Sequence, residues 1–415
     1  MRKYRFNLKY FFKKGILMIA LILQEAILKA QNVGYVDSSN VQTIRINPKA
    51  ALTQQVDYED VINELEYIPL ETTNKSAFGT IDQLEITPDY FIILDKSSTF
   101  VNFHPKSSIL IFTKEGKFHA RIDLEWASVF AVDHKSHEIV APENGGRFLS
   151  YFDFNGKLIR KVDQPFLFDS FVFLPGDLIA YFKGFRTDPY QKIISVTDQQ
   201  KFCNILLCKP NFEINKVFFP FDTTGIKLDQ LRQGNLHYFT TSGSEIFVRR
   251  PYQFHFFNLE KGQLIDKYHF IFPLENSLPS NFLADKKFKG KWVQHLIEAP
   301  DEIFDMSNFY KTPNAIAFTL YNSRMIKSFF YNLKTGALTS LSSIKTDSKN
   351  VITSFNREII GSDGSFLFSW LKANQLFGGN KSSPINYYGS SNQIQEFFKN
   401  GKIRDNPILI KFKVI

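Results

Sequence analysis

The sequence has only two cysteines, Cys203 and Cys208, among 415 residues. No cysteine occurs near the N-terminus, which excludes attachment of a lipid to an N-terminal cysteine. If both cysteines lie on one strand, five steps of ~3.3 Å place their Cα atoms roughly 16 Å apart, too far for a disulfide. We therefore expect two buried strand residues. The alternative, a metal or redox pair, would need a turn between them.

A hydrophobic run long enough to cross a membrane is also missing from the N-terminal region. Its apolar core, Gly15 to Leu23, has nine residues, whereas a transmembrane helix needs ~20. Six basic residues precede this core, and a small residue, Ala30, follows it. This order predicts a signal peptide over 1–30, with an uncleaved anchor as the alternative. We expect export to the periplasm or cell surface, with no membrane span after cleavage.

The chain has little excess charge outside this segment. Residues 1–30 contribute +6 of the formal net charge of +9, so the remainder carries only +3. Such a balanced body lacks the electrostatic footprint of a nucleic-acid-binding protein. No nucleic-acid partner is expected.

Motifs that mark common enzymes are absent as well. The sequence contains no glycine-rich phosphate loop, nucleophile elbow or zinc-binding helix signature. Proline (17) and glycine (21) are few, whereas the 45 phenylalanines and 17 tyrosines favour strands. The composition predicts a globular chain rich in β-structure and gives no positive sign of catalysis.

A hairpin pattern is repeated along the chain. In 152–162, an aromatic strand runs into a polar turn closed by Gly156, and a second strand follows. Related copies occur at 112–118, 257–262 and 331–336, and a fifth copy at 194–202 has lost its glycine. The pattern indicates several antiparallel hairpins of similar design.

A second signal, a turn pair followed by a short strand, occurs six times at spacings of 39 to 71 residues. Repetition on this scale predicts a propeller or array. We predict an all-β fold, a six-bladed β-propeller of four-stranded antiparallel blades over 65–415, closed by pairing strands 65–70 and 408–414 in the last blade. The six turn pairs are Pro88-Asp89, Ser136-His137, Pro175-Gly176, Ser242-Gly243, Pro313-Asn314 and Asp363-Gly364.

The remaining segments are predicted to lie outside the blades. Residues 31–64 form a polar leader, with a short helix over 56–65. Insertions are expected near 208–233, 273–302 and 372–402, with short helices at 292–297 and 393–399. An insertion of this kind offers a contact surface to other proteins.

Several motifs resemble those of a six-bladed β-propeller family of exported proteins, often lipoproteins, from Gram-negative anaerobes. The matching stretches are 67–73, 92–95, 114–118 and 406–409. The resemblance implies the propeller fold and says little about activity, because most members have no assigned function. Two departures are the missing lipid-attachment cysteine and the segment 123–128, which replaces a stretch rich in glycine and proline.

The mouth of the channel is the expected binding site, because loops from every blade converge there. With four antiparallel strands in each blade, the connections between strands 2 and 3 and those between blades are expected at the mouth. An arginine guanidinium can bind a carboxylate through two hydrogen bonds, and aromatic rings can stack on a ligand. A site that contains both kinds of side chain suits acidic sugars or peptides. For each residue the alternative is an ordinary solvated loop side chain. The candidate ligand-binding residues are Trp126, Glu143, Arg147, Arg186, Arg250, Tyr321 and Arg324.

Two polar clusters have both a structural and a chemical interpretation. His134 and His137 are interpreted as part of a polar hairpin turn, since a zinc site needs three or four convergent ligands. Asp301, Glu302 and Asp305 are interpreted as a solvated loop entering a strand, with a hard-cation site or acid/base pair as the alternative.

The sequence thus favours an exported, monomeric, non-catalytic propeller that binds a ligand or partner protein through its mouth. No metal site or cofactor is predicted. One alternative is a propeller hydrolase or lyase with a divalent cation on the axis. Another is a structural subunit of an envelope assembly that uses the insertions as contact surfaces. Fold analogy does not rank these alternatives.

Overall fold

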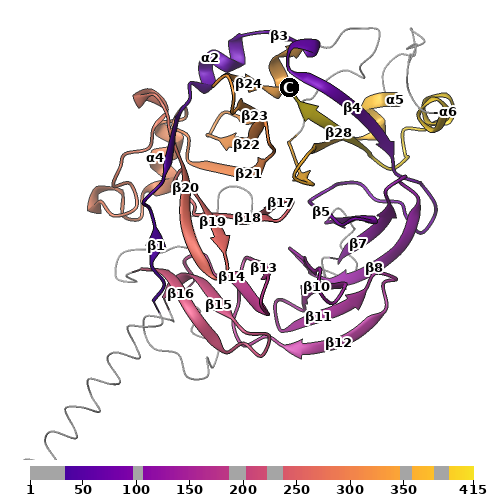
Figure 1. Ribbon diagram of the computed structural model, residues 1–415, viewed down its shortest axis with the longest axis horizontal. Coiled ribbons are helices and arrows are strands. Elements are labelled where there is room, and N and C mark those ends of the chain that lie inside the picture. The colour runs from indigo at the N-terminus through magenta and orange to yellow at the C-terminus, as the bar shows by residue number, and fades with distance from the viewer. Residues whose placement is uncertain (1–32, 97–105, 187–201, 222–236, 346–357, 378–391) are drawn as a thin grey trace, which may run out of the picture.

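The computed structural model describes residues 33–96, 106–186, 202–221, 237–345, 358–377 and 392–415. Six four-stranded antiparallel sheets form a ring, which confirms the predicted six-bladed propeller (Figure 1). Blades are numbered here in chain order, and strand 1 of each blade is the innermost. Blade 1 consists of β5 (Gln83–Ile86), β6 (Tyr90–Asp95), β7 (Lys106–Thr113) and β8 (Phe118–Glu125). Blade 2 consists of β9 (Ala131–Asp133), β10 (Glu138–Glu143), β11 (Phe148–Asp153) and β12 (Leu158–Asp163). Blade 3 consists of β13 (Ser170–Leu174), β14 (Leu178–Phe182), β15 (Cys203–Cys208) and β16 (Ile214–Pro220).

The other three blades follow the same plan, with additions at their outer edges. Blade 6 combines strands from both ends of the described chain. Blade 4 consists of β17 (Phe239–Ser242), β18 (Glu245–Arg249), β19 (His255–Glu260) and β20 (Gln263–Ile271). Blade 5 consists of β21 (Asp305–Lys311), β22 (Ala315–Tyr321), β23 (Ile326–Asn332) and β24 (Leu338–Ser340). Blade 6 consists of β26 (Gly361–Ser362), β27 (Leu367–Leu371), β28 (Ile408–Val414) and β4 (Ile62–Pro69).

The middle strands are buried on both faces, because each blade lies between two others. In β6, Ile92 and Leu94 pack in a core cluster shared with blade 2. Phe91 and Ile93 alternate with them and pack in a cluster shared with blade 6. Successive side chains of a strand point to opposite faces, so a continuous apolar run suits a strand between two neighbours. This explains the high content of phenylalanine and isoleucine.

All six predicted turn pairs connect strands 1 and 2 of successive blades. These turns define one face of the disc, called here the turn face. Strands 2 and 4 of each blade end at the opposite face, called here the mouth face. The repeated hairpin pattern connects strands 3 and 4 in blades 1, 2, 4 and 5. Blade 3 uses the turn between Cys208 and Ile214 instead, and most of 194–202 lies outside the described residues.

Ring closure occurs in blade 6, as predicted. Strand β28 near the C-terminus pairs antiparallel with β4, with Ile410 opposite Tyr67, and β4 is the outermost strand. Figure 1 shows the two strands side by side. The ring is thereby closed by hydrogen bonds between segments more than three hundred residues apart in sequence.

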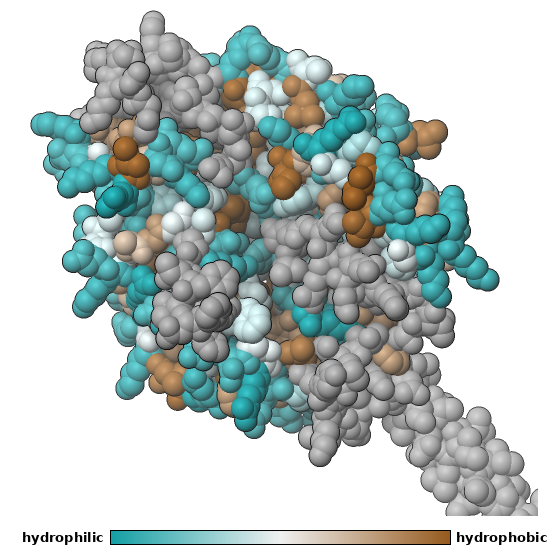
Figure 2. Space-filling view, turned by 180° about the vertical axis from the view of Figure 1, so that it is seen from behind, coloured by the Kyte–Doolittle hydropathy of each residue, from teal (hydrophilic) through white to brown (hydrophobic). Residues whose placement is uncertain are grey.

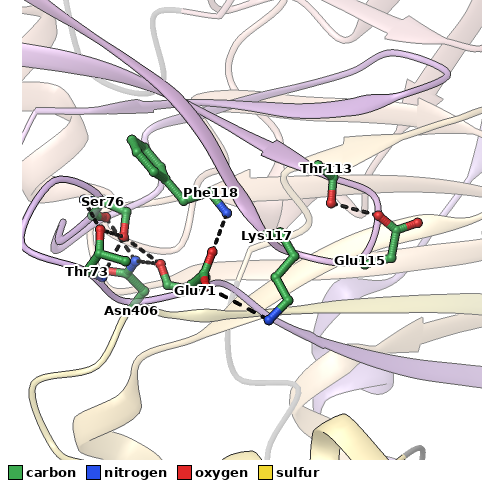
Figure 3. Close-up of polar contacts among 8 residues, drawn as sticks. All are labelled: Glu71, Thr73, Ser76, Thr113, Glu115, Lys117, Phe118 and Asn406. Carbon is green, nitrogen blue, oxygen red and sulfur yellow. Dashed lines mark hydrogen bonds and ion pairs between the residues drawn. The ribbon is translucent and has the colours of Figure 1, made fainter.

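A hydrogen-bonded clasp made by the family-like motifs secures this closure (Figure 3). The Asn406 side chain is fully buried and donates to the carbonyls of Glu71 (2.8 Å) and Ser76 (2.9 Å), while its Oδ1 accepts from the Phe78 amide at 3.0 Å. The Glu71 carboxylate accepts from the Phe118 amide at 2.9 Å. At Gly116 (φ +78°), an added Cβ would lie 2.1 Å from the Pro69 carbonyl oxygen. Three of the four motifs, 67–73, 114–118 and 406–409, therefore meet at the closure of the ring.

The segment before β4 forms a belt along the outer edges of several blades. Strands β1 (Val36–Asp37) and β2 (Gln42–Arg45) pair parallel with β20, and β3 (Val56–Asp57) pairs with β25 (Ile344–Lys345). A helix does precede the propeller, but it is α2 (Pro48–Thr53) rather than 56–65. The side chain of Asn47 caps α2 by accepting from the Ala50 amide at 3.1 Å. In the predicted helical stretch, pairing with β28 and β25 favours strands instead.

Short helices occur mainly in the expected insertions. The stretch 273–302 contains η3 (Leu274–Asn276), η4 (Lys286–Phe288) and α4 (Trp292–Glu298), and 372–402 contains α5 (Ala373–Phe377) and α6 (Asn392–Asn400). One further turn, η1 (Tyr58–Asp60), precedes β4, and η5 (Leu341–Ser343) follows β24. The stretch 208–233 differs from expectation, because it includes β16, the fourth strand of blade 3. The predicted signal peptide lies outside the described residues.

Candidate functional site

The central channel is crossed by contacts between two opposite blades. His237, just before β17 of blade 4, donates from Nε2 to the carbonyl oxygen of Asp82, just before β5 of blade 1, at 3.0 Å. A longer contact of 3.5 Å joins Thr241 Oγ1 to Glu85 Oε2. Blades 1 and 4 face each other in a ring of six. These contacts therefore divide the channel into two chambers.

The first, called here the mouth chamber, lies on the side of blades 5 and 6 and has a volume of about 420 Å³. Inner-strand residues form most of its wall, and residues at the ends of β23 and β27 extend it toward the mouth face. On the turn face, Gly243 and Gly364 pack together: a Cβ on Gly364 would lie 3.0 Å from the Gly243 Cα. The chamber is therefore narrowed on the turn face.

The lining of the mouth chamber is mainly polar. Asp82 and Glu85 come from blade 1, Asn308 from β21 and Glu358 from the segment before β26. Asn308 Nδ2 donates to Glu358 Oε2 at 3.1 Å. Trp370 adds an indole ring. The remaining polar residues of the lining include Thr80, His237, Thr240, Thr241, Lys327, Ser328, Ser342 and Lys372.

Glu85 lines both chambers. Burial in the wall raises its pKa from 4.5 to about 7, against the opposing effect of hydrogen bonds from Gln83 and Thr241. Gln83 Nε2 donates to Glu85 Oε1 at 3.2 Å. Burial has the largest effect on Glu85, so loss of its proton is disfavoured. Glu85 is consequently protonated in a large fraction of molecules at neutral pH.

The pKa of His237 is shifted in the opposite direction. Burial and the nearby positive charge of Lys96 lower its pKa to about 3. A carbonyl oxygen can only accept, so the contact with Asp82 places a proton on Nε2. His237 is therefore neutral at physiological pH and acts as a hydrogen-bond donor across the channel.

A buried ion pair supports the wall between blades 4 and 5. The Arg249 guanidinium contacts the Asp305 carboxylate, with side chains only 2% and 4% exposed. Burial raises the pKa of Asp305 to about 6 despite the opposing charge of Arg249. The interpretation of Asp305 as part of a solvated loop is therefore wrong. It fits Asp301, which is exposed and pairs with Arg324 at 3.0 Å.

The second chamber, called here the turn-side chamber, lies on the side of blades 2 and 3 and has a volume of about 540 Å³. Its wall includes β9, β13 and the first turns of blades 2, 3 and 4. Among the described residues that line it, apolar side chains predominate on β13 and β14. The two chambers share Gln83, Glu85, His237, Phe239 and Thr241.

Most of the predicted ligand-binding residues have structural contacts of their own. Arg186 binds Asp169 at 2.8 Å, and Glu143 pairs with Lys161 at 2.9 Å. Arg250 donates to Asn204 at 2.9 Å and lies over the Phe219 ring, and burial lowers its pKa to about 10. These contacts hold blade edges and neighbouring blades together.

The other predicted residues are spread over the mouth face. Trp126 is 63% exposed at the end of blade 1. Arg147 is exposed in blade 2 and lies 5.1 Å from the Phe148 ring centre, and Arg324 pairs with Asp301 in blade 5. Tyr321 is buried, and its hydroxyl donates to Glu358 at 3.4 Å. Tyr321 thus contacts a residue of the mouth chamber directly.

The two histidines of the polar cluster occupy the predicted turn. Residues 134–137 connect β9 and β10, and His137 has a positive φ of 56°. No group of three or more potential metal ligands is present among the described residues. Cys203 and Cys208 are both buried at the ends of β15, as expected for strand residues.

The residues that line the mouth chamber were missed because they are far apart in sequence. A usable signal existed, however: each turn pair follows the innermost strand of its blade. Glu85 and Thr241 are polar residues within such strands, just before Pro88-Asp89 and Ser242-Gly243. Polar side chains at these positions face the channel rather than a neighbouring blade.

No curated protein matches the sequence. A protein of Bacteroides fragilis, inferred to be exported, has a similar structure, with a TM-score of 0.68, 15% sequence identity, and coverage of 90% of this chain and 100% of that one. A DUF4221 family member from Bacteroides vulgatus gives a TM-score of 0.39 at 11% identity, covering 87% and 98% of the two chains. The first comparison supports the fold, and the second is too weak to support an argument.

A family model also matches most of the sequence. The model, described as a domain of unknown function (DUF4934), covers residues 41–413. The match begins within the belt and ends in β28, so it includes all six blades and the closure. In the part of the chain that the structure describes, no helix is long and apolar enough to span a membrane.

Proposed function

The chain belongs to the DUF4934 family, a domain family of unknown function, and we propose that it is an exported propeller that binds a hydroxyl-rich ligand, such as a mono- or disaccharide, in the mouth chamber. The proposal of export rests on the predicted signal peptide over 1–30. In this proposal the protein holds its ligand without changing it.

The polar character of the mouth chamber is the observation that carries this proposal. Its volume of about 420 Å³ lies within the ~300–1,000 Å³ typical of small-molecule sites. Asn308, Glu358 and Ser328 provide both donors and acceptors within one enclosure. A sugar presents closely spaced hydroxyl groups, each able to donate and accept. The indole of Trp370 adds an aromatic surface for the apolar face of a ring.

The entrance favours ligands that carry an acidic group. Lys327 and Lys372, both partly exposed, line the chamber near the mouth face. A lysine ammonium attracts carboxylates and sulfates through charge and up to three hydrogen bonds. Acidic sugars are therefore expected to bind more tightly than neutral sugars of the same size.

Glu85 favours a second candidate function, acid-assisted cleavage of a bond in the bound ligand. A carboxyl group with a pKa of about 7 in a chamber wall has the property needed for a general acid. Under this alternative, Glu85→Gln would retain ligand binding and lose product formation. Under the leading proposal, the wild-type protein would release the ligand unchanged.

Calorimetric titration with a panel of neutral and acidic oligosaccharides tests the leading proposal. Ser342→Trp places a large ring at an exposed position of the chamber and is expected to weaken binding at least about tenfold. Lys327→Ala is expected to weaken binding of acidic sugars selectively. Lys334→Ala, an exposed lysine on the turn-face side of blade 5, is the matched control and should have no effect. Equal affinities for all variants would contradict the proposal.

A further inference from the structure

The turn-side chamber is larger than the mouth chamber and chemically different from it. Its volume of about 540 Å³ lies within the ~300–1,000 Å³ range of small-molecule sites. It extends along β9 and β13 to the turn face, where the exposed residues Ser136, Asp177 and Ser244 line its opening. The chamber therefore opens on the side of the disc opposite to the mouth.

Apolar side chains form its body. Phe171, Phe173 and Ile179 come from blade 3, and Phe239 and Ile246 come from blade 4. Phe173 is only partly buried, although it is a large apolar residue on an inner strand. An apolar ligand would remove more of this surface from water, and each Å² of apolar area buried contributes about 25 cal/mol.

Four charged groups of the chamber form two ion pairs. Arg160 Nη2 binds Glu138 Oε2 at 2.9 Å, and the guanidinium lies 3.8 Å from the Tyr151 ring centre. At the opening, Lys135 Nζ pairs with Asp177 Oδ1 at 2.5 Å. A charged ligand would have to lose its hydration beside the apolar walls, which is costly. The lining thus disfavours an ionic ligand.

We propose that the turn-side chamber is a second binding site, which takes a neutral, largely apolar aromatic or alicyclic molecule. Thr241 and Glu85 at its inner end provide hydrogen-bonding groups for one polar substituent. The raised pKa of Glu85, caused by burial, is consistent with an uncharged environment there. This site shares a wall with the proposed sugar site but lies on the side of blades 2 and 3, and it does not depend on that proposal.

Two fluorescent dyes that share one ring system test the proposal. N-phenyl-1-naphthylamine is neutral, and 1-anilinonaphthalene-8-sulfonate carries a sulfonate on the same framework. Titration of the full chain is expected to show saturable fluorescence enhancement with the neutral dye, and affinity at least about tenfold lower for the sulfonate. Equal or tighter binding of the sulfonate would overturn the assignment to a neutral ligand.

Substitutions in the lining test whether the neutral dye binds in the turn-side chamber. Phe173→Glu introduces a charge into the chamber, and Ser244→Trp places a ring at its exposed opening on the turn face; both are expected to weaken binding of the neutral dye at least about tenfold. Leu274→Ser, which removes an exposed leucine outside the lining of both chambers, is the control and should leave binding unchanged. Loss of binding in the control alone, or in none of the variants, would overturn the proposal. Ser244→Trp alters an exposed turn and keeps the test valid if Phe173→Glu fails to fold.

Discussion

The Nε2 of His237 donates to the carbonyl oxygen of Asp82 at 3.0 Å, joining two blades that face each other across the channel. Propeller blades normally contact only their neighbours through packed sheets. Here a side-chain hydrogen bond adds a direct connection across the axis. It separates a polar chamber from a largely apolar one, and the two proposed ligands differ accordingly.

Removal of this connection is expected to destabilise the ring. In His237→Ala, the Asp82 carbonyl loses its donor, at a cost of about 1–3 kcal/mol in the free energy of unfolding. His119→Ala, which removes an exposed histidine, should cost much less. Urea unfolding followed by tryptophan fluorescence measures both. Similar losses in the two variants would mean that the crossing hydrogen bond contributes little.

The raised pKa of Glu85 predicts that the free energy of unfolding depends on pH. Its folded-state pKa of about 7 lies above the unfolded value near 4.5, so the folded state retains the proton over this interval. Stability from this group is full below about pH 4.5 and is lost as the pH rises through about 7. Relative to Glu85→Gln, the wild type should lose up to about 3 kcal/mol between pH 5 and pH 8. Urea unfolding across this range measures the difference, and a constant difference would contradict the assignment.

The buried pair of Arg249 and Asp305 is expected to be sensitive to loss of one charge. Asp305→Asn leaves the Arg249 charge inside the wall without its carboxylate, at a cost of about 3–5 kcal/mol. The exposed pair of Arg324 and Asp301 provides the control, because Asp301→Asn should cost about 0–1 kcal/mol. Chemical denaturation of the two variants compares them directly. Equal costs would show that burial adds nothing to the first pair.

The clasp at Asn406 is expected to be essential for closure. Asn406→Ala removes the partner of three backbone groups, the carbonyls of Glu71 and Ser76 and the amide of Phe78, and should cost about 3 kcal/mol or more. Asn155→Ala, in an exposed hairpin turn, is the control. Limited proteolysis should cut the variant faster near both ends of the propeller. Unchanged stability and cleavage would contradict the role assigned to Asn406.

The fold was largely predictable from the sequence, because its signals are local. Each turn pair, such as Pro88-Asp89, connects the first two strands of a blade, and six such pairs predict six blades. The helix was misplaced because the cap formed by Asn47 and Pro48 was overlooked. Strand pairing with β28 also outweighed the weak helical pattern after Val56.

The candidate site was much less predictable, because it depends on contacts between blades. Glu85 and Thr241 lie 156 residues apart in sequence and meet only because blades 1 and 4 face each other. Arg186 and Arg250 were chosen as ligand-binding groups because arginine is a common anion ligand. In the structure they bind Asp169 and Asn204, and sequence spacing gives no indication of these partners.

A crystal structure of the protein with the sugar that binds most tightly would test the central claim most directly. The account predicts electron density for the sugar in the mouth chamber, with hydroxyl groups within hydrogen-bond distance of Asn308 or Glu358 and a ring beside Trp370. Density at the outer mouth face, against Arg147 or Arg324, with an empty mouth chamber would contradict it.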